Sequence, residues 1–345
     1  MSRFKAPNLS FFLSDKALGK EILKIIDELN ISSSGNLGSV SFDVVTVAAV
    51  QLLYKKYASL AEYVKDMNSY VEQAANNRAQ LIVFPAYTGM LPFSVAPQFE
   101  SSAERLLSES KNDFPKAEDI KECISAFSDY AYEIYYTTMS MLAAKYRVYI
   151  MAGSTIYYDG DVLRHRAFLF DDTGSLAGFQ DKISLTPLER KLEIEAAYEI
   201  KVFETSVAPI VLLTGSDVDY YETGKIAKAL GAKIIINPNA YIDEYTAVDD
   251  AAGLNLRVQE NSIYGIKSVI AGDSGLGAVF QGASCFYIPN ELAKIKNGIL
   301  EKAIGGMQPQ VLCCKLDIDK LDNIKNSYTA DKNPEFMEKY IDRIY

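Results

Sequence analysis

The sequence lacks several residue types on which common protein chemistries depend. Among its 345 residues there is no tryptophan and only one histidine, His165. A single histidine excludes a metal site built from several histidines. The four cysteines, Cys123, Cys285, Cys313 and Cys314, form no CxxC pair, which argues against a zinc ribbon or a thioredoxin-like motif. We therefore expect neither a bound metal nor a cofactor.

Excess positive charge and long apolar runs are also missing. The net charge is −10, so charge gives no reason to expect binding to nucleic acid or to an anionic membrane surface. No uninterrupted apolar stretch reaches the roughly 18 residues of a membrane-spanning helix. The first twenty residues lack the apolar core of a signal peptide. Together with irregularly spaced thiols, these features predict a cytoplasmic protein.

The residues that are present fit a globular protein with extensions at both ends. The chain is 49% hydrophobic and 23% charged, which is typical of a folded soluble domain. A helix capped by Asp15 is predicted before the Ser/Gly-rich stretch ISSSGNLGS, so we expect residues 1–42 to form an N-terminal helical extension. Residues 321–345 are predicted to form a C-terminal tail helix, which leaves residues 43–320 as the main domain.

The main domain alternates short β-branched runs with helical stretches. Apolar runs such as LIVFP, PIVLLTG and KIIINPN are typical of strands that are covered on both faces. Leu60, Val64, Met67 and Val71 follow a helical spacing between the first two strands. This alternation predicts an α/β layered fold rather than a helical bundle or an all-β barrel.

Four segments of this domain, in this order, resemble the nitrilase or carbon–nitrogen hydrolase superfamily. They are AQLIVFPAYTGM, GSLAGFQDKISLTPLER, VLLTGSDVDYYETGKIAKALGAKIIINP and RVQENSIYGIKSVIAGDSG. Each segment alone is a weak match, whereas their order and spacing make a specific pattern. The resemblance implies a four-layer α-β-β-α sandwich and a homodimer or higher homo-oligomer.

The resemblance also implies a set of catalytic positions, of which this chain keeps only part. The superfamily hydrolyses nonpeptide C–N bonds with a Glu–Lys–Cys set and a supporting second Glu. Lys182 matches the lysine position and Glu189 matches the second glutamate. Ala86 stands where the general-base glutamate is expected, and Gly215 stands where the nucleophilic cysteine is expected.

These two substitutions predict a catalytically impaired protein. In the family chemistry a thiolate attacks the electrophilic carbon, and a carboxylate accepts the thiol proton and later activates water. The lysine stabilises the negative charge that develops on the intermediate. Without the nucleophile at Gly215 and the base at Ala86, most of the rate enhancement should be lost.

No other residue is an obvious replacement nucleophile. Ser216 adjoins the vacant position, but neighbouring side chains on a strand or tight turn point in different directions. Asp217 aligns with an acidic family position that has no nucleophilic role. The four cysteines lie in predicted strands or in a helix, where we expect inert structural thiols. His165 precedes a predicted strand, and we expect it at the surface.

Three readings of the function therefore stay open. The leading one is an impaired member that retains a pocket for a small amide or carboxylate around Lys182, with Ser216 and Asp217 beside the ligand. Lys182 then becomes available to hold a carboxylate or carbonyl oxygen, because a catalytic carboxylate is absent. The first alternative is an active amidohydrolase that uses a rearranged nucleophile such as Ser216. The second alternative is a structural subunit in which the Lys182–Glu189 pair only shapes a loop.

Overall fold

The structure is a computed structural model, and it describes residues 15–29, 44–109, 115–242, 245–274 and 278–324, with three isolated positions, 335, 338 and 339. The linker predicted after the first helix and most of the predicted tail helix lie outside the described residues. The helices are α1 Asp15–Glu28, α2 Leu60–Asn76, η2 Thr88–Val95, α3 Phe99–Glu109, α4 Ala117–Tyr146, α5 Pro187–Lys191, η3 Gly215–Asp219, α6 Tyr221–Ala229, α7 Ala247–Ala251, α8 Leu254–Asn261 and α9 Ile318–Asp322.

The strands join into one hydrogen-bonded order, β5-β4-β3-β2-β1-β9-β8-β7-β6. Their bounds are β1 Val44–Leu53, β2 Leu81–Val83, β3 Tyr149–Asp159, β4 Val162–Phe170, β5 Leu176–Asp181, β6 Val202–Phe203, β7 Ile210–Leu212, β8 Ile234–Asn239, β9 Tyr264–Asp273, β10 Val279–Phe280, β11 Cys285–Tyr287, β12 Ile299–Lys302 and β13 Gln310–Asp317.

Two halves of this order form two packed sheets. β1 and β9 run parallel and pair only near their carboxyl ends, where Leu52 and Leu53 meet Ile270 and Ala271. One buried cluster contains side chains of β1–β4 together with side chains of β7, β8, β9 and β11, so the two halves face each other across a shared core. A register shift in β3, between Met151 and Ser154, accompanies its pairing with β4.

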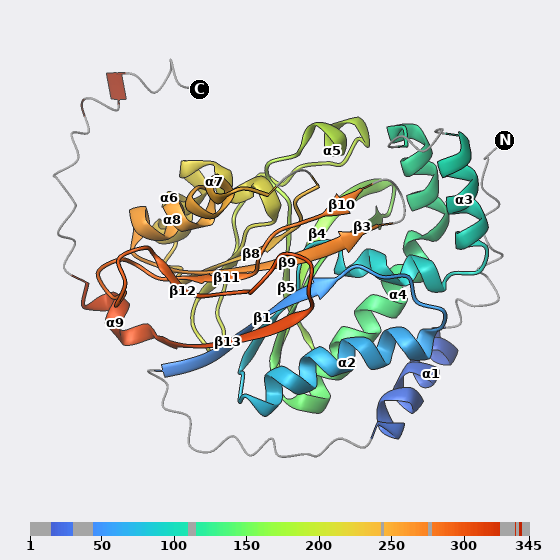
Figure 1. The fold of residues 1–345 in the computed structure, drawn as a ribbon, viewed down its shortest axis with the longest axis horizontal. Coiled ribbons are helices and arrows are strands. Elements are labelled where there is room, and N and C mark those ends of the chain that lie inside the picture. Colours follow the sequence, from blue (N-terminus) through green and yellow to red (C-terminus); the bar gives the residue numbers. More distant parts are fainter. Residues whose placement is uncertain are drawn as a thin grey trace.

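Helices cover the two outer faces of the sheets. A second buried cluster joins the other face of β1–β4 to α1, α2, α3 and α4. A third joins β7 and β8 to α6 and α8. Figure 1 shows these two groups of helices on opposite sides of the strands. The fold is therefore the predicted α-β-β-α sandwich, because each sheet buries one face against the other sheet and one against helices.

The helix α1 packs on the outer helical layer next to α2 and α4. Ile22 and Ile26, one turn apart, are 0% and 1% exposed. Their spacing places both on one face of the helix, which explains why an apolar stripe at this period predicts burial. The ammonium group of Lys145 on α4 donates a hydrogen bond to the Ile26 carbonyl, near the end of α1. Among the helices of the described residues, none is long and apolar enough to cross a membrane.

Candidate active site

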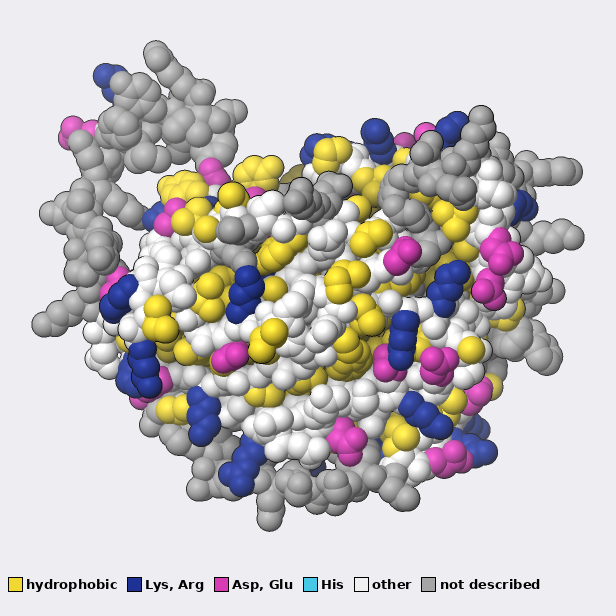
Figure 2. All heavy atoms as spheres, in the orientation of Figure 1, with side chains coloured by type: hydrophobic (Ala, Val, Ile, Leu, Met, Phe, Trp, Pro, Cys, Tyr) yellow, Lys and Arg dark blue, Asp and Glu magenta, His cyan; other side chains and the backbone are white. Residues whose placement is uncertain are grey.

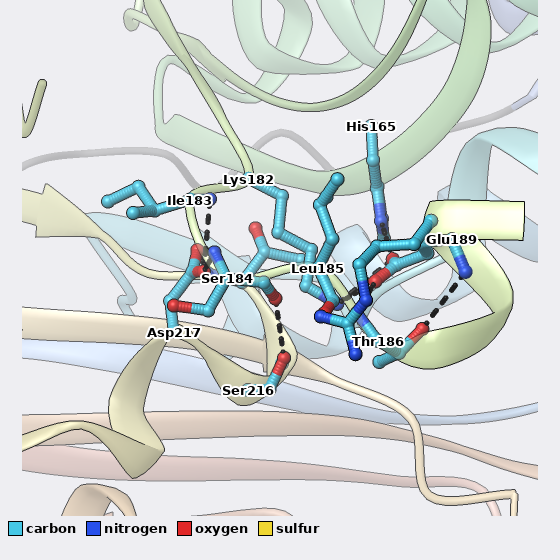
Figure 3. A network of polar contacts seen from close by, with 12 residues as sticks. His165, Lys182, Ile183, Ser184, Leu185, Thr186, Glu189, Ser216 and Asp217 are labelled. Atoms are coloured by element: carbon cyan, nitrogen blue, oxygen red, sulfur yellow. Dashed lines mark hydrogen bonds and ion pairs between the residues drawn. The ribbon is translucent and has the colours of Figure 1, made fainter. Parts of the chain in front are cut away.

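Lys182 and Glu189 form a buried pair next to a cavity. The Lys182 Nζ lies 2.7 Å and 2.9 Å from the two carboxylate oxygens of Glu189, and the two residues are 3% and 1% exposed. Lys182 directly follows β5, and Glu189 lies in the short helix α5. Lys182 and Glu189 are seven positions apart in the sequence, and the turn between β5 and α5 brings their side chains into contact (Figure 3).

The start of α5 fixes the Glu189 carboxylate. The Thr186 N–H donates to Glu189 Oε2 at 2.7 Å, and the Glu189 N–H donates to Thr186 Oγ1 at 3.2 Å. This is a capping box, and Pro187 at the first turn suits a helix start. The same carboxylate thus caps its helix and binds Lys182, so its orientation is set by local backbone structure.

His165 also contacts Glu189, and the prediction that it lies at the surface is wrong. It lies within β4, is 1% exposed, and places Nδ1 2.6 Å from Glu189 Oε1. Its Nε2 lies 2.7 Å from the Ser154 Oγ, and the Tyr87 ring stacks on the imidazole with centroids 5.0 Å apart. The prediction failed because β4 begins at Val162, before the run RAFLFDD from which the strand was predicted, and Tyr87 covers the imidazole.

The protonation states of Glu189 and His165 follow from their burial and from the groups that they contact. Burial alone raises the pKa of Glu189, but the hydrogen bonds from His165 and Lys182 and the positive charge of Lys182 outweigh it and hold that pKa well below its usual value. Burial lowers the pKa of His165, so its imidazole is neutral near pH 7. Because an ionised carboxylate only accepts, His165 Nδ1–H donates to Glu189 and Nε2 accepts from the Ser154 hydroxyl. The Tyr87 N–H in turn donates to Ser154 Oγ at 3.2 Å.

Ser154, His165 and Glu189 follow the order of a Ser–His–acid hydrolase triad. Ser154 is, however, fully buried, and it is absent from the residues that line the neighbouring cavity. A hydroxyl with no access to the cavity cannot attack a molecule bound there. We therefore assign this chain of hydrogen bonds a positioning role, in which it holds Tyr87, His165 and Glu189 together.

Gly215 lies directly opposite Lys182. Its φ is +53°, in the left-handed region that favours glycine. An ideal Cβ built on Gly215 lies 3.4 Å from Lys182 Nζ, which is ordinary van der Waals contact. A side chain at this position therefore points at the lysine ammonium.

Ser216 and Asp217 are tied to the loop that follows Lys182. The Ser216 hydroxyl donates to the Ser184 carbonyl at 2.7 Å. The fully buried Asp217 carboxylate accepts from the backbone N–H groups of Ile183, Ser184 and Thr214 at 3.0, 2.6 and 3.0 Å (Figure 3). Burial raises the pKa of Asp217 to about 7, against the lowering effects of these donors and of Lys182. Asp217 thus joins the turn at Gly215 to the Lys182 loop.

A cavity of about 680 Å³ opens beside these residues. Ala86, Lys182, Gly215 and Ser216 line it together with His165 and Tyr87, so the structure brings four of the six predicted site residues to one surface. Glu189 and Asp217 lie behind that surface. Sequence reasoning missed two acidic residues that also line the cavity, Asp219 and Asp249. The sequence did offer a signal for Asp219, because it lies two residues after Asp217 on the turn that follows the strand. In the described part of the chain, no group of three or more His, Cys, Asp or Glu side chains could hold a metal ion.

The four cysteines lie elsewhere. Cys123 on α4 and Cys285 on β11 are buried, while Cys313 and Cys314 on β13 are partly buried. Cys313 packs against the core beneath α2 and α4, and Cys314 packs against the core between the sheets, as alternation along a strand requires. None of them lines the cavity.

Comparison with known proteins agrees with this architecture. Residues 46–291 match the model of the carbon–nitrogen hydrolase family. The chain is 29% identical over 233 residues to the probable hydrolase YhcX of Bacillus subtilis, an alignment that covers 67% of this chain and 40% of that relative.

Solved structures of an amidase from Nesterenkonia sp. AN1 share the fold. A double mutant of that amidase in complex with acrylamide superposes with a TM-score of 0.61 at 20% identity, covering 86% of this chain and 97% of the amidase. A second mutant structure, with acrylamide added at the active-site cysteine of the amidase, gives the same TM-score and covers 99% of that chain. The family match spans most of the main domain, and this chain belongs to the carbon–nitrogen hydrolase family.

Proposed function

We propose that this protein binds a small amide or carboxylate in the cavity beside Lys182 and does not hydrolyse it by the family's thiol mechanism. The observation that carries the proposal is the pairing of Gly215 with Lys182. The position that faces the ammonium group has no side chain, although the space in front of it would accept a Cβ. Position 86, which also lines the cavity, is alanine and contributes no carboxylate.

Lys182 supplies the polar contact for a ligand oxygen. Its ammonium group has three N–H donors, and two point at the Glu189 oxygens. The third donor remains for a carbonyl or carboxylate oxygen on the side of Gly215. Since the Glu189 charge balances the Lys182 charge, a neutral amide carbonyl fits this position as well as an anion does.

The geometry gives little support to a rearranged nucleophile. The Ser216 hydroxyl donates to a backbone carbonyl, and no base among the described residues accepts its proton. The nearest carboxylate in sequence, Asp217, is buried and accepts three backbone N–H groups. An active hydrolase with Ser216 as nucleophile is therefore the weaker candidate.

A separate surface supports the homodimer that we propose for this chain. Exposed apolar side chains gather on α6, α7 and α8, where Figure 2 shows hydrophobic atoms over that corner of the molecule. The members are Tyr220, Tyr221, Ile226, Leu230, Val248 and Leu256. An apolar surface of this kind is typical of a protein–protein contact, and a second copy of the chain is its proposed occupant.

Binding and turnover experiments test the proposal together. Isothermal titration calorimetry with a panel of small amides and acids should show binding to the wild type, and ammonia release from the same amides should stay at the buffer blank. Lys182→Met should weaken binding about 10- to 100-fold, the range for a lost hydrogen bond from a charged group. Lys65→Met, at an exposed position on α2, is the matched control and should bind like the wild type.

Two results would contradict the proposal in different ways. Wild-type turnover that disappears in Ser216→Ala would identify an active hydrolase with a rearranged nucleophile. An absence of binding to the whole panel, in a protein that unfolds cooperatively, would leave a structural subunit with a vestigial cavity.

A further inference from the structure

The charges that line the cavity are unevenly distributed. Lys182 lines the cavity, and the Glu189 carboxylate behind it balances the Lys182 charge. His165 is neutral near pH 7, because burial lowers its pKa. Asp219 and Asp249 line the same cavity. The summed charge of the lining and its buried partner is therefore negative, and the carboxylates of Asp219 and Asp249 supply the excess negative charge.

Asp219 lies at the end of η3, four residues after Gly215. No hydrogen bond or ion pair reaches its carboxylate from the described residues, and the side chain is exposed. Removal of part of its water raises the pKa of Asp219, and the positive charges of Lys182 and Arg257 oppose that rise. Arg257 itself pairs with Glu260, at 3.3 Å. The Asp219 carboxylate is thus available to a cation that enters the cavity.

Asp249 lines the cavity from a different segment, the short helix α7. Its Oδ2 accepts hydrogen bonds from Thr246 N–H and Thr246 Oγ1, both at 2.7 Å. These neutral donors fix the carboxylate but leave its charge uncompensated. Asp249 also contributes negative charge at Asp219. Two carboxylates from two separate helices therefore face one region of the cavity.

We infer that the ligand is a small amide that also carries a protonated amine. Its amide oxygen accepts from Lys182 beside Gly215, and its ammonium group lies between Asp219 and Asp249. Apolar side chains of Tyr87, Leu188 and Ile242 line the same cavity and suit a short methylene chain between the two polar ends. An ammonium group compensates two carboxylates, whereas a second anion is repelled by them.

This inference rests on the proposed function, because it names the class of ligand for the same cavity. The probes are three molecules of similar length: δ-aminovaleramide with an amine, valeramide with a methyl group, and glutaramate with a carboxylate. Calorimetry on the wild type should show δ-aminovaleramide binding about tenfold more tightly than valeramide, and glutaramate more weakly than either. Added salt should reduce this preference, since the charge interaction is screened.

Variants then test whether Asp219 and Asp249 cause the preference for δ-aminovaleramide. In Asp219→Asn combined with Asp249→Asn, δ-aminovaleramide should lose its advantage, so that it and valeramide bind about equally. Asparagine preserves the size of each side chain, and at position 249 its Oδ1 can still accept from the Thr246 N–H in the capping box of α7. Asp161→Asn, in the turn between β3 and β4, is the matched control and should retain the full preference.

Each contrary result has a distinct meaning. Equal binding of δ-aminovaleramide and valeramide to the wild type would overturn the inference but leave the proposed function standing. A preference for glutaramate would also overturn it, because the sign of the recognised charge would be reversed. If none of the three probes bound at any salt concentration, the inference would fall, and the wider panel of small amides and acids would decide whether the proposed function stands.

Discussion

The two walls of the cavity differ in how their residues are held. On one wall, here called the polar wall, His165, Lys182 and Glu189 are buried and bonded to one another. On the other, here called the vacant wall, Ala86 and Gly215 present no polar side chain. Of the two, only the polar wall carries charged side chains.

The two walls differ in how much the folded structure depends on their side chains. Glu189 binds Lys182, His165 and a backbone N–H, so its removal leaves several buried polar groups without partners. A side chain at Gly215 would only touch the end of Lys182, and nothing in the fold depends on it. The polar wall is therefore part of the folded structure, whereas a nucleophile on the vacant wall serves chemistry alone.

The largest expected effect comes from breaking the polar wall. Glu189→Ala should lower the free energy of unfolding by about 3–5 kcal/mol, because a buried lysine loses its countercharge. Urea denaturation followed by circular dichroism measures this change. Glu193→Ala is the matched control, since Glu193 is exposed and pairs only at the surface with Lys121. It should change stability little. Similar losses in the two variants would refute the distinction between the walls.

A smaller effect is expected from filling the vacant wall. Gly215→Ala should cost about 1–2 kcal/mol, because a left-handed backbone disfavours a Cβ while the space itself accepts one. Gly160→Ala provides the control: its φ is +64° and a Cβ there meets nothing within 4 Å. The two variants should lose about the same stability in urea denaturation. A much larger loss for Gly215→Ala would mean that the vacant wall is also a structural element.

The smallest effect concerns the response of the polar wall to pH. Burial lowers the pKa of His165 below its ordinary value of 6.5, so the unfolded chain binds a proton more readily than the folded chain does. Stability contributed by neutral His165 is therefore present above pH 6.5 and is lost as the pH falls below it. His165→Gln should show a shallower fall in Tm between about pH 7 and pH 5 than the wild type.

The comparison of wild type and variant isolates this effect from other groups. The pKa of Asp217 is raised to about 7 from 3.8, so its contribution is lost as the pH rises from about 4 to 7, with the opposite sign. That contribution is common to both proteins and cancels in the difference. An equally steep fall in Tm in His165→Gln would show that the imidazole does not control the acid response.

Sequence patterns predicted the regular elements better than the irregular ones. The runs LIVFP, PIVLLTG and KIIINPN were predicted as strands, and they contain β2, β7 and β8. They are strongly patterned because both of their faces are buried. The strand β5 was missed, since the sequence LAGFQD has few β-branched residues and its burial pattern is mostly partial. Tertiary pairing with β4 makes it a strand.

The same contrast applies to the candidate site. Lys182, Glu189, Ala86 and Gly215 were placed from motif order, since a turn that follows a strand carries recognisable local residues. His165 was placed wrongly, and Asp219 and Asp249 were not singled out. Their roles depend on which distant segments close over them: Tyr87 covers His165, and α7 brings Asp249 to the cavity that Asp219 also lines.

The sequence by itself determined the family, the layered α/β class and the absence of a thiol at position 215. Each of these is encoded in residue identity and short-range order, which a linear chain already contains. Only the tertiary structure decided that Gly215 faces Lys182, that a single buried histidine completes the polar wall, and that two aspartates give the cavity its negative charge. Burial and charge compensation depend on contacts between segments far apart in the chain, and those distances exist only after folding.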